Sequence, residues 1–107
     1  MFCFHASTAL EDLGNGVKRR ILVHEGQMMA VENIFEKGGV GAMHSHPHEQ
    51  ITYVLSGRFR FTIGDEVHEV TAGDTLHKNP HVMHGCTCLE AGALIDVFTP
   101  QREDFLR

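Results

Sequence analysis

Alternation of apolar and polar residues dominates the chain, and a period of two is typical of strands that bury one face. It is clearest over residues 58–63, where every second residue from Phe59 is apolar. Residues 17–24 and 28–36 are rich in β-branched and apolar side chains and are separated by residues 25–27, which include a glycine. Because a short break of this kind between two such segments is typical of a tight turn, we predict a β-hairpin here.

Clusters of glycine, aspartate, asparagine and serine divide the rest of the chain into short segments of the same character. No segment carries a convincing helical stripe, and only residues 102–106 are expected to add a helical turn. Residues 1–16 are weakly patterned. The pattern therefore predicts an all-β fold, either a sandwich or a small barrel. Its further strands are predicted at residues 51–55, 58–63, 67–71, 75–78, 82–89 and 93–99.

Histidines and one amide residue interrupt this pattern at the spacing of metal ligands. Side chains two apart on a strand point to the same face with their Cα atoms about 7 Å apart, so His44 and His46 can converge on one ion. Pro47 cannot donate to a sheet ladder, and we expect it to end or bulge the strand just after His46 and to let Gln50 swing back toward the same point. With His84 as the downstream ligand, imidazole nitrogens and a side-chain carbonyl oxygen suit a late first-row divalent metal.

A histidine-rich surface loop without a metal is the alternative, because 9 histidines in 107 residues must produce some pairs by chance. His48 either orients a ligand, touches a substrate or is a plain loop residue. The other histidines are expected to be solvated or to lie behind the ligands. They are His5, His24, His68, His77 and His81.

The length and charge of the chain limit the number of domains and the classes of binding partner. A chain of 107 residues fits one compact domain, and 42% hydrophobic with 21% charged residues is ordinary for a soluble globular protein. The formal charge of −5 argues against general nucleic-acid binding, which needs a basic face. The basic cluster Lys18-Arg19-Arg20 is expected to be a solvated strand edge.

Cysteine usage and the absence of apolar runs indicate a reduced, non-membrane setting. No run approaches a membrane span and the N-terminus lacks the features of a signal peptide, so we expect no membrane partner and a cytoplasmic location. Three cysteines, an odd number, fit reduced thiols better than disulfides. Cys86 and Cys88 share strand parity with His84, so either can approach the metal, although we favour a role as small buried apolar residues.

Two motifs together span most of residues 38–84. The first is Gly38, His44, His46, Gln50 and Gly57, and the second is Gly73, Asp74, Pro80 and His84. Both resemble the motifs of the cupin superfamily. The resemblance implies a small single-domain barrel of the jelly-roll, or double-stranded β-helix, type, whose four ligand positions hold one divalent metal. We accordingly divide residues 1–107 into an N-terminal arm (1–16), a barrel (17–100) and a C-terminal tail (101–107).

Gln50 departs from the superfamily pattern, in which a glutamate usually occupies this position. Three histidines and a neutral oxygen leave the charge of the metal uncompensated, which makes it a stronger Lewis acid and a better anchor for an anionic substrate. Zinc, nickel, manganese, iron and cobalt are all candidates, because a site of this kind accepts several ions.

A narrower resemblance covers nearly the whole chain. Residues 11–19, 46–50 and 96–106 are similar to the KdgF family of small cupins, which is associated with pectin and alginate breakdown. The resemblance implies a homodimeric, non-redox, isomerase-like enzyme with one small-molecule substrate class. It converts 4,5-unsaturated uronate monosaccharides to linear keto-uronates by ring opening and tautomerisation.

The same resemblance carries over Asp96, Phe98 and Arg102 as active-site residues outside the metal set. Asp96 and Phe98 share one strand face with Leu94, so the acid is placed among apolar neighbours, where an unpaired carboxylate is costly. In this interpretation Asp96 moves the proton as general acid and base, and Arg102 holds the substrate carboxylate. Judged on the residues alone, a paired edge aspartate, a surface arginine and a core phenylalanine remain the alternatives.

Two other functions remain open at this stage. The first is an Fe(II)-dependent cupin dioxygenase, because three histidines and one oxygen ligand also suit iron with open positions for O₂. The second is a non-catalytic cupin that binds a small molecule, since small β-barrels also serve as ligand sensors. Whether a uronate substrate comes from pectin or from alginate is not decided by these motifs.

Overall fold

The computed structural model describes residues 1–106 and consists almost entirely of strands. A short 3₁₀ turn, η1 (His5–Ser7), precedes the first strand, and another, η2 (Glu103–Leu106), follows the last. In chain order the strands are β1 (Glu11–Gly14), β2 (Val17–Glu25), β3 (Met28–Phe35), β4 (Val40–His44), β5 (Glu49–Ile63), β6 (Glu66–Thr71), β7 (Thr75–Lys78) and β8 (His84–Thr99).

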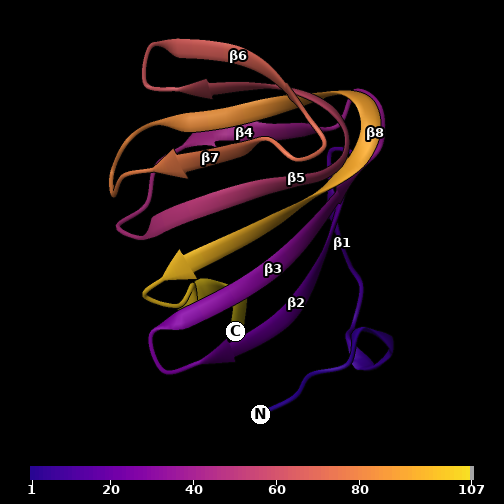
Figure 1. Cartoon of the computed structure of the whole chain (residues 1–107), viewed down its shortest axis with the longest axis vertical. Helices are drawn as coiled ribbons and strands as arrows, with labels where there is room; N and C mark the ends of the chain where they lie inside the picture. The colour runs from indigo at the N-terminus through magenta and orange to yellow at the C-terminus, as the bar shows by residue number, and fades with distance from the viewer. Residues whose placement is uncertain (107) are drawn as a thin grey trace.

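The strands form one antiparallel sheet that curls into a barrel, as Figure 1 shows. The order across the sheet is β1-β2-β3-β8-β5-β6, with β4 pairing to β8 and β7 pairing to β5. The long strands β5 and β8 pair along most of their length and take part in both halves of the barrel. The predicted all-β cupin-type barrel is confirmed, and the predicted hairpin is formed by β2 and β3.

At two places where the sequence predicted turns between strands, the structure has bends within continuous strands. We predicted separate strands on either side of Ser56-Gly57 and of residues 90–92, and both predictions were wrong because β5 and β8 run through these segments. The two strands approach each other closely here: a Cβ on Gly92 would lie 2.1 Å from the Ser56 carbonyl oxygen. Gly57 has φ +81, a conformation that favours glycine. The glycines therefore allow a tight crossing of two continuous strands.

The strand that carries the first histidine ends earlier than predicted. β4 ends at His44, so the prediction of one strand running through His46 was wrong. The carbonyl oxygen of His46 accepts a hydrogen bond of 2.7 Å from the N–H of His81, in the loop before β8. This backbone hydrogen bond replaces one that a strand would make within the sheet, and it links the segment that carries His44 and His46 to the loop that precedes His84.

The N-terminal segment holds more structure than its weak pattern indicated. β1 pairs antiparallel with β2 and extends the sheet by one short strand. The division into arm, barrel and tail stays a prediction, and Arg107 at the end of the predicted tail lies outside the described residues. No helix within residues 1–106 is long and apolar enough to cross a membrane.

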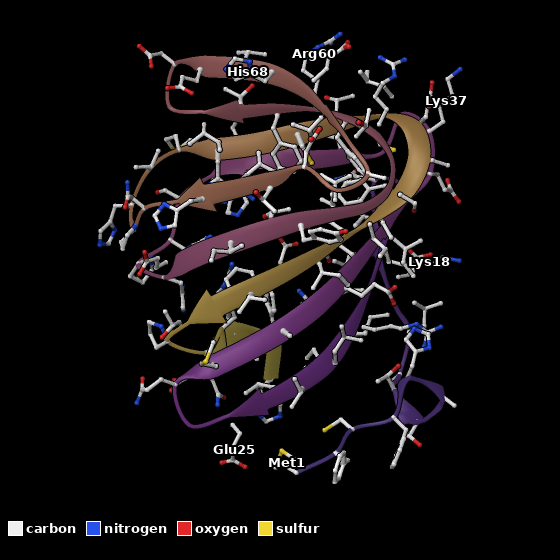
Figure 2. The ribbon with its side chains drawn as sticks, viewed as in Figure 1. Met1, Lys18, Glu25, Lys37, Arg60 and His68 are labelled. Carbon is white, nitrogen blue, oxygen red and sulfur yellow. The ribbon has the colours of Figure 1, made fainter. Side chains whose placement is uncertain are left out.

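The basic cluster on β2 is not uniformly solvated. Lys18 points away from the barrel, as Figure 2 shows. Arg19 points inward: its side chain is only 12% exposed and its guanidinium carbon lies 3.8 Å from the centroid of the Phe105 ring. The prediction of a solvated edge was therefore wrong for Arg19, because alternate residues of a strand face opposite sides of the sheet.

Two apolar clusters occupy the interior. Phe59 and Phe61 are buried on one face of β5, as the alternation predicted. The larger cluster is formed by Val17, Phe35, Val54, Phe59, Phe61, Val70, Cys88 and Leu94, and the smaller by Met29, Val31 and Phe98.

Candidate metal centre

The three histidines predicted as ligands meet at one point, where His46 and His84 are buried and His44 is exposed. His44 is the last residue of β4, His84 is the first of β8, and the two are partners across the ladder. His46 follows β4 and turns back toward them, with ring centroids 5.5 Å from His44 and 4.9 Å from His84. Each residue offers a ring nitrogen, and these nitrogens all lie within 4.8 Å of one another. This cluster could hold one metal ion.

Backbone carbonyls determine which imidazole nitrogens face the centre of the cluster. His44 Nδ1 lies 2.7 Å from the carbonyl oxygen of Ala42, and His84 Nδ1 lies 3.0 Å from that of Val82. Donation from each Nδ1–H leaves Nε2 with a free lone pair. His84 Nε2 is buried and has no hydrogen-bond partner within the described part of the chain. A metal ion would satisfy this otherwise costly nitrogen.

Gln50 presents its amide oxygen to the histidine cluster. The residue is 5% exposed, and its Oε1 lies 3.0 Å from His46 Nε2. Its Nε2 donates to Asp96 Oδ1 over 2.8 Å and to Thr52 Oγ1 over 3.4 Å. Because an ionised carboxylate only accepts hydrogen bonds, the amide must turn its nitrogen toward Asp96 and its oxygen toward the histidines. The oxygen is therefore placed as a fourth ligand.

Burial keeps two of the imidazoles in the neutral form. Desolvation lowers the pKa of His46 and of His84 from 6.5 to about 4. The positive charge of Arg102 contributes to this lowered pKa of His46, and that of Lys78 contributes to the lowered pKa of His84. Since a metal binds the neutral imidazole, both residues are ready for an ion at neutral pH.

The metal-free protein is expected to lose stability as the pH falls from about 6.5 to about 4. His46 and His84 titrate near 6.5 in the unfolded chain and near 4 in the folded one, so the unfolded chain binds more protons in this interval. Each shift corresponds to about 3 kcal/mol at most. Urea unfolding of chelator-treated protein at about pH 7 and about pH 4.5 measures the loss. A His46→Gln/His84→Gln variant should lose less over the same interval, and an equal loss would contradict the assignment.

Asp96 lies in the middle of a buried hydrogen-bond network. It is 4% exposed and accepts hydrogen bonds from three side chains on neighbouring strands. Thr52 Oγ1 and Gln50 Nε2 donate to Oδ1 over 2.5 and 2.8 Å, and Asn33 Nδ2 donates to Oδ2 over 2.6 Å. These donors stabilise the carboxylate. Oδ2, with a single donor, retains a lone pair that can accept a proton.

Phe98 and Arg102 lie beside the histidines at the edge of the site. The Phe98 ring centroid is 5.8 Å from that of His46 and 6.3 Å from that of His48. The guanidinium carbon of Arg102 lies 5.3 Å from the centroid of the Phe98 ring. Asp104 accepts two hydrogen bonds from Arg102, from Nε over 3.0 Å and from Nη2 over 2.8 Å. The guanidinium is thus held in a fixed orientation near the aromatic ring.

One cavity of about 210 Å³ is lined by residues of the site other than His46 and Arg102, and Cys86 is the cysteine that reaches it. Burial raises the pKa of the Cys86 thiol to about 11, so it stays protonated at neutral pH. Cys88 instead packs in the apolar core and donates to the Glu90 carbonyl oxygen. The cavity lining includes His44, Gln50, Lys78, His84, Asp96 and Phe98.

Six of the seven predicted site residues come together, whereas Arg102 contacts the site through Phe98 and does not line the cavity. Three further polar residues belong to the network around Asp96. Asn33, Thr52 and Lys78 were not singled out from the sequence. Thr52 shares strand parity with Gln50, and Asn33 lies on the inward parity of β3 between two buried apolar residues. A polar residue at an inward position of an alternating strand is the signal that could have identified both.

Sequence and structure comparisons place the chain near small cupins. Residues 31–98 match the sequence model of the family described as Cupin domain. The pectin degradation protein KdgF of Dickeya dadantii (strain 3937) is 42% identical over 101 residues, which cover 92% of each chain. The structure of KdgF from Halomonas sp. is 34% identical with a TM-score of 0.93 and covers 98% of this chain and 97% of that one. An RmlC-like cupin from Shewanella frigidimarina NCIMB 400 is 43% identical with a TM-score of 0.94, covering 97% and 94%.

Proposed function

The chain belongs to the cupin superfamily and, within it, to the KdgF family, and from this premise we propose that it is an enzyme of pectin breakdown. We infer that its substrate is a 4,5-unsaturated uronate monosaccharide, which it converts to a linear keto-uronate. The observation that carries this proposal is the Asp96 carboxylate, held in one cavity with the histidine and amide donors. A uronate from alginate and a cytoplasmic location stay predictions.

The donor set fits a resident divalent metal. Three imidazoles and one amide oxygen converge, and a metal ion would pair with the buried Nε2 of His84, which has no hydrogen-bond partner among residues 1–106. When bound, such an ion supplies Lewis-acid stabilisation of negative charge that develops on substrate oxygens. Zinc, nickel, manganese, iron and cobalt all accept these donors.

Asp96 is the group proposed to move the proton. Ring opening removes the proton of the anomeric hydroxyl, forms the C1 carbonyl and breaks the bond between C1 and the ring oxygen. The ring oxygen leaves as the enolate oxygen on C5, and this enolate becomes a ketone at C5 when a proton is delivered to C4. One proton leaves an oxygen and one arrives at carbon, so a single carboxylate can act first as base and then as acid. No oxidant, reductant or water is consumed.

Arg102 and Phe98 are proposed to orient the sugar. Asp104 binds Nε and Nη2 of Arg102, while Nη1 has no hydrogen-bond partner within residues 1–106. A guanidinium nitrogen of this kind suits a substrate carboxylate. Phe98 then offers an apolar face beside His46 against which the ring can pack.

An assay with an unsaturated uronate tests the proposed function. Purified metal-loaded protein is mixed with the monosaccharide released by a polysaccharide lyase, and the ultraviolet band of the conjugated double bond is followed. We expect the band to decay much faster than in buffer, because the product no longer has a double bond conjugated to the carboxylate. Decay at the buffer rate would exclude this reaction. Oxygen uptake coupled to turnover and dependent on iron would identify a dioxygenase instead.

We infer that the protein is a homodimer whose interface is the outer face of β3, β8 and β5. Ile51 and Tyr53 of β5 are 50% and 43% exposed. They lie opposite Val97 and Ile95 of β8, and Ala30 of β3 lies beyond Val97. Soluble proteins rarely leave a contiguous apolar patch without a partner, which favours a second copy of the chain here.

Tyr53→Glu is therefore expected to convert the dimer to a monomer, because it places a charge in the apolar interface. Analytical ultracentrifugation at micromolar concentration measures the change in mass. Val67→Glu is the matched control: Val67 lies on β6, outside this face, and is 53% exposed. A Tyr53→Glu protein that keeps the mass of the wild type would contradict the proposed interface.

A further inference from the structure

Lys78 is a buried amine that the proposed reaction does not use. It is the last residue of β7 and is 3% exposed. Its Nζ donates to Thr52 Oγ1 over 2.9 Å and lies 4.8 Å from the centroid of the Phe61 ring. Lysine is almost never fully buried without a specific partner, so the burial of Lys78 beside Thr52 requires an explanation.

The hydrogen bond from Lys78 to Thr52 affects the orientation of the Thr52 hydroxyl and, through Asp96, of the Gln50 amide. Lys78 Nζ donates to the Thr52 oxygen and so occupies one of its lone pairs, which leaves the hydroxyl proton for Asp96 Oδ1. The Gln50 amide nitrogen donates to the same carboxylate oxygen, which turns its Oε1 toward His46. The donors and acceptors from Lys78 to the amide oxygen therefore form one ordered series.

Strand register holds this series in place. Lys78 is the partner of Gln50 across the ladder of β7 and β5, and Thr52 is the partner of Asp96 across the ladder of β5 and β8. The four side chains thus project from three adjacent strands of a rigid sheet. Burial lowers the pKa of Lys78 while the charge of Asp96 acts to raise it. The amine can donate to Thr52 in either protonation state.

We propose that Lys78 is a positioning residue that acts through Thr52 and Asp96 to hold the amide oxygen of Gln50 toward the metal. The inference rests on the proposed function in one respect, which is that Gln50 serves as a metal ligand. Without the nitrogen of Lys78, only the longer contact of 3.4 Å from Gln50 Nε2 restrains the Thr52 hydroxyl, so Asp96 loses a firmly held donor. The amide of Gln50 is then no longer restricted to one orientation.

Titration with Co²⁺ alone tests this role without any substrate. Metal-free full-length protein is titrated and followed by the d–d absorption of Co²⁺ and by competition with a chelator. Lys78→Met keeps the apolar stem and removes the nitrogen, and Thr52→Val keeps the shape and removes the hydroxyl. Each variant should bind Co²⁺ about tenfold more weakly, the low end for residues behind a metal ligand. Their spectra should move toward that of Gln50→Ala.

Lys18→Met is the matched control, because Lys18 points away from the barrel and should leave Co²⁺ binding unchanged (Figure 2). If Lys78 acts through Thr52, the double variant should be no weaker than the weaker single variant. Wild-type affinity and spectrum in Lys78→Met would overturn the proposal, and so would effects that multiply in the double variant.

If Lys78→Met does not fold, a second pair of variants tests whether the Thr52 hydroxyl contributes to Co²⁺ binding. Thr52→Ser retains the hydroxyl and should bind Co²⁺ like the wild type, whereas Thr52→Val should not. Equal Co²⁺ affinity in these two variants would overturn the proposal. Failure of the wild type to consume an unsaturated uronate would instead overturn the proposed function, and the Co²⁺ titration would still decide the role of Lys78.

Discussion

Asp96→Asn is expected to lower kcat on the unsaturated uronate by about 10²- to 10⁴-fold, the range for loss of a general acid and base. The carboxylate is the group proposed to carry a proton from the anomeric hydroxyl to C4, and an amide cannot do so. Steady-state measurements of the ultraviolet decay give kcat and KM separately. We expect KM to change little, because the substrate is held by other groups.

A control separates lost chemistry from lost folding. Asp96→Asn presents an amide nitrogen to Asn33, which must turn its own amide to accept from it, so the loss of stability should not exceed about 1–3 kcal/mol, the cost of an unpaired donor. Adding Asn33→Asp restores a donor and acceptor pair between β3 and β8. The double variant should regain stability in urea unfolding and remain inactive. Recovery of turnover in it, or wild-type kcat in Asp96→Asn, would rule out the proposed role.

Removal of the metal is expected to lower kcat/KM by about a thousandfold or more, because an ion that stabilises charge on substrate oxygens supplies several kcal/mol. Protein treated with a chelator and then desalted is assayed before and after addition of each candidate divalent ion. Activity should return only with ions that bind, and metal analysis of protein purified without chelator should find about one ion per chain.

Single histidine variants extend this prediction. His84→Ala should abolish both metal retention and turnover, since it removes a buried nitrogen aimed at the centre of the site. His68→Ala is the matched control: His68 is an exposed residue of β6 that lies on the outside of the barrel (Figure 2). Full activity in chelator-treated protein, or metal retention in His84→Ala, would show that the histidines serve another purpose.

The strands were largely predictable because alternation is a local property of the sequence. The hairpin of β2 and β3 and the inward face around Phe59 and Phe61 follow from it directly. The turns predicted at Gly57 and Gly92 were wrong for an identifiable reason. A glycine that ends a strand and a glycine that allows two strands to cross have the same local signature. Only the partner strand distinguishes them.

The candidate site was predictable only where its residues lie in motifs. His44, His46 and Gln50 fall within one short segment, so spacing alone indicated that they could converge. Asn33, Thr52 and Lys78 come from three different strands and meet only through the register of the folded sheet. Their polar side chains are each ordinary in isolation. Long-range pairing, which no single segment encodes, makes them a network with Asp96.

The pairing of His44 with His84 has a consequence for how the folding equilibrium of the protein depends on metal binding. The two residues belong to β4 and β8, and the chain between them passes through β5, β6 and β7. Closing so long a segment carries an entropic cost that the chain must meet before these ligands can share an ion. An ion that needs the complete set therefore binds the native state in preference to the unfolded chain. By mass action a bound ion would shift the folding equilibrium toward the native state, so the concentration of free ion would affect the stability of the protein.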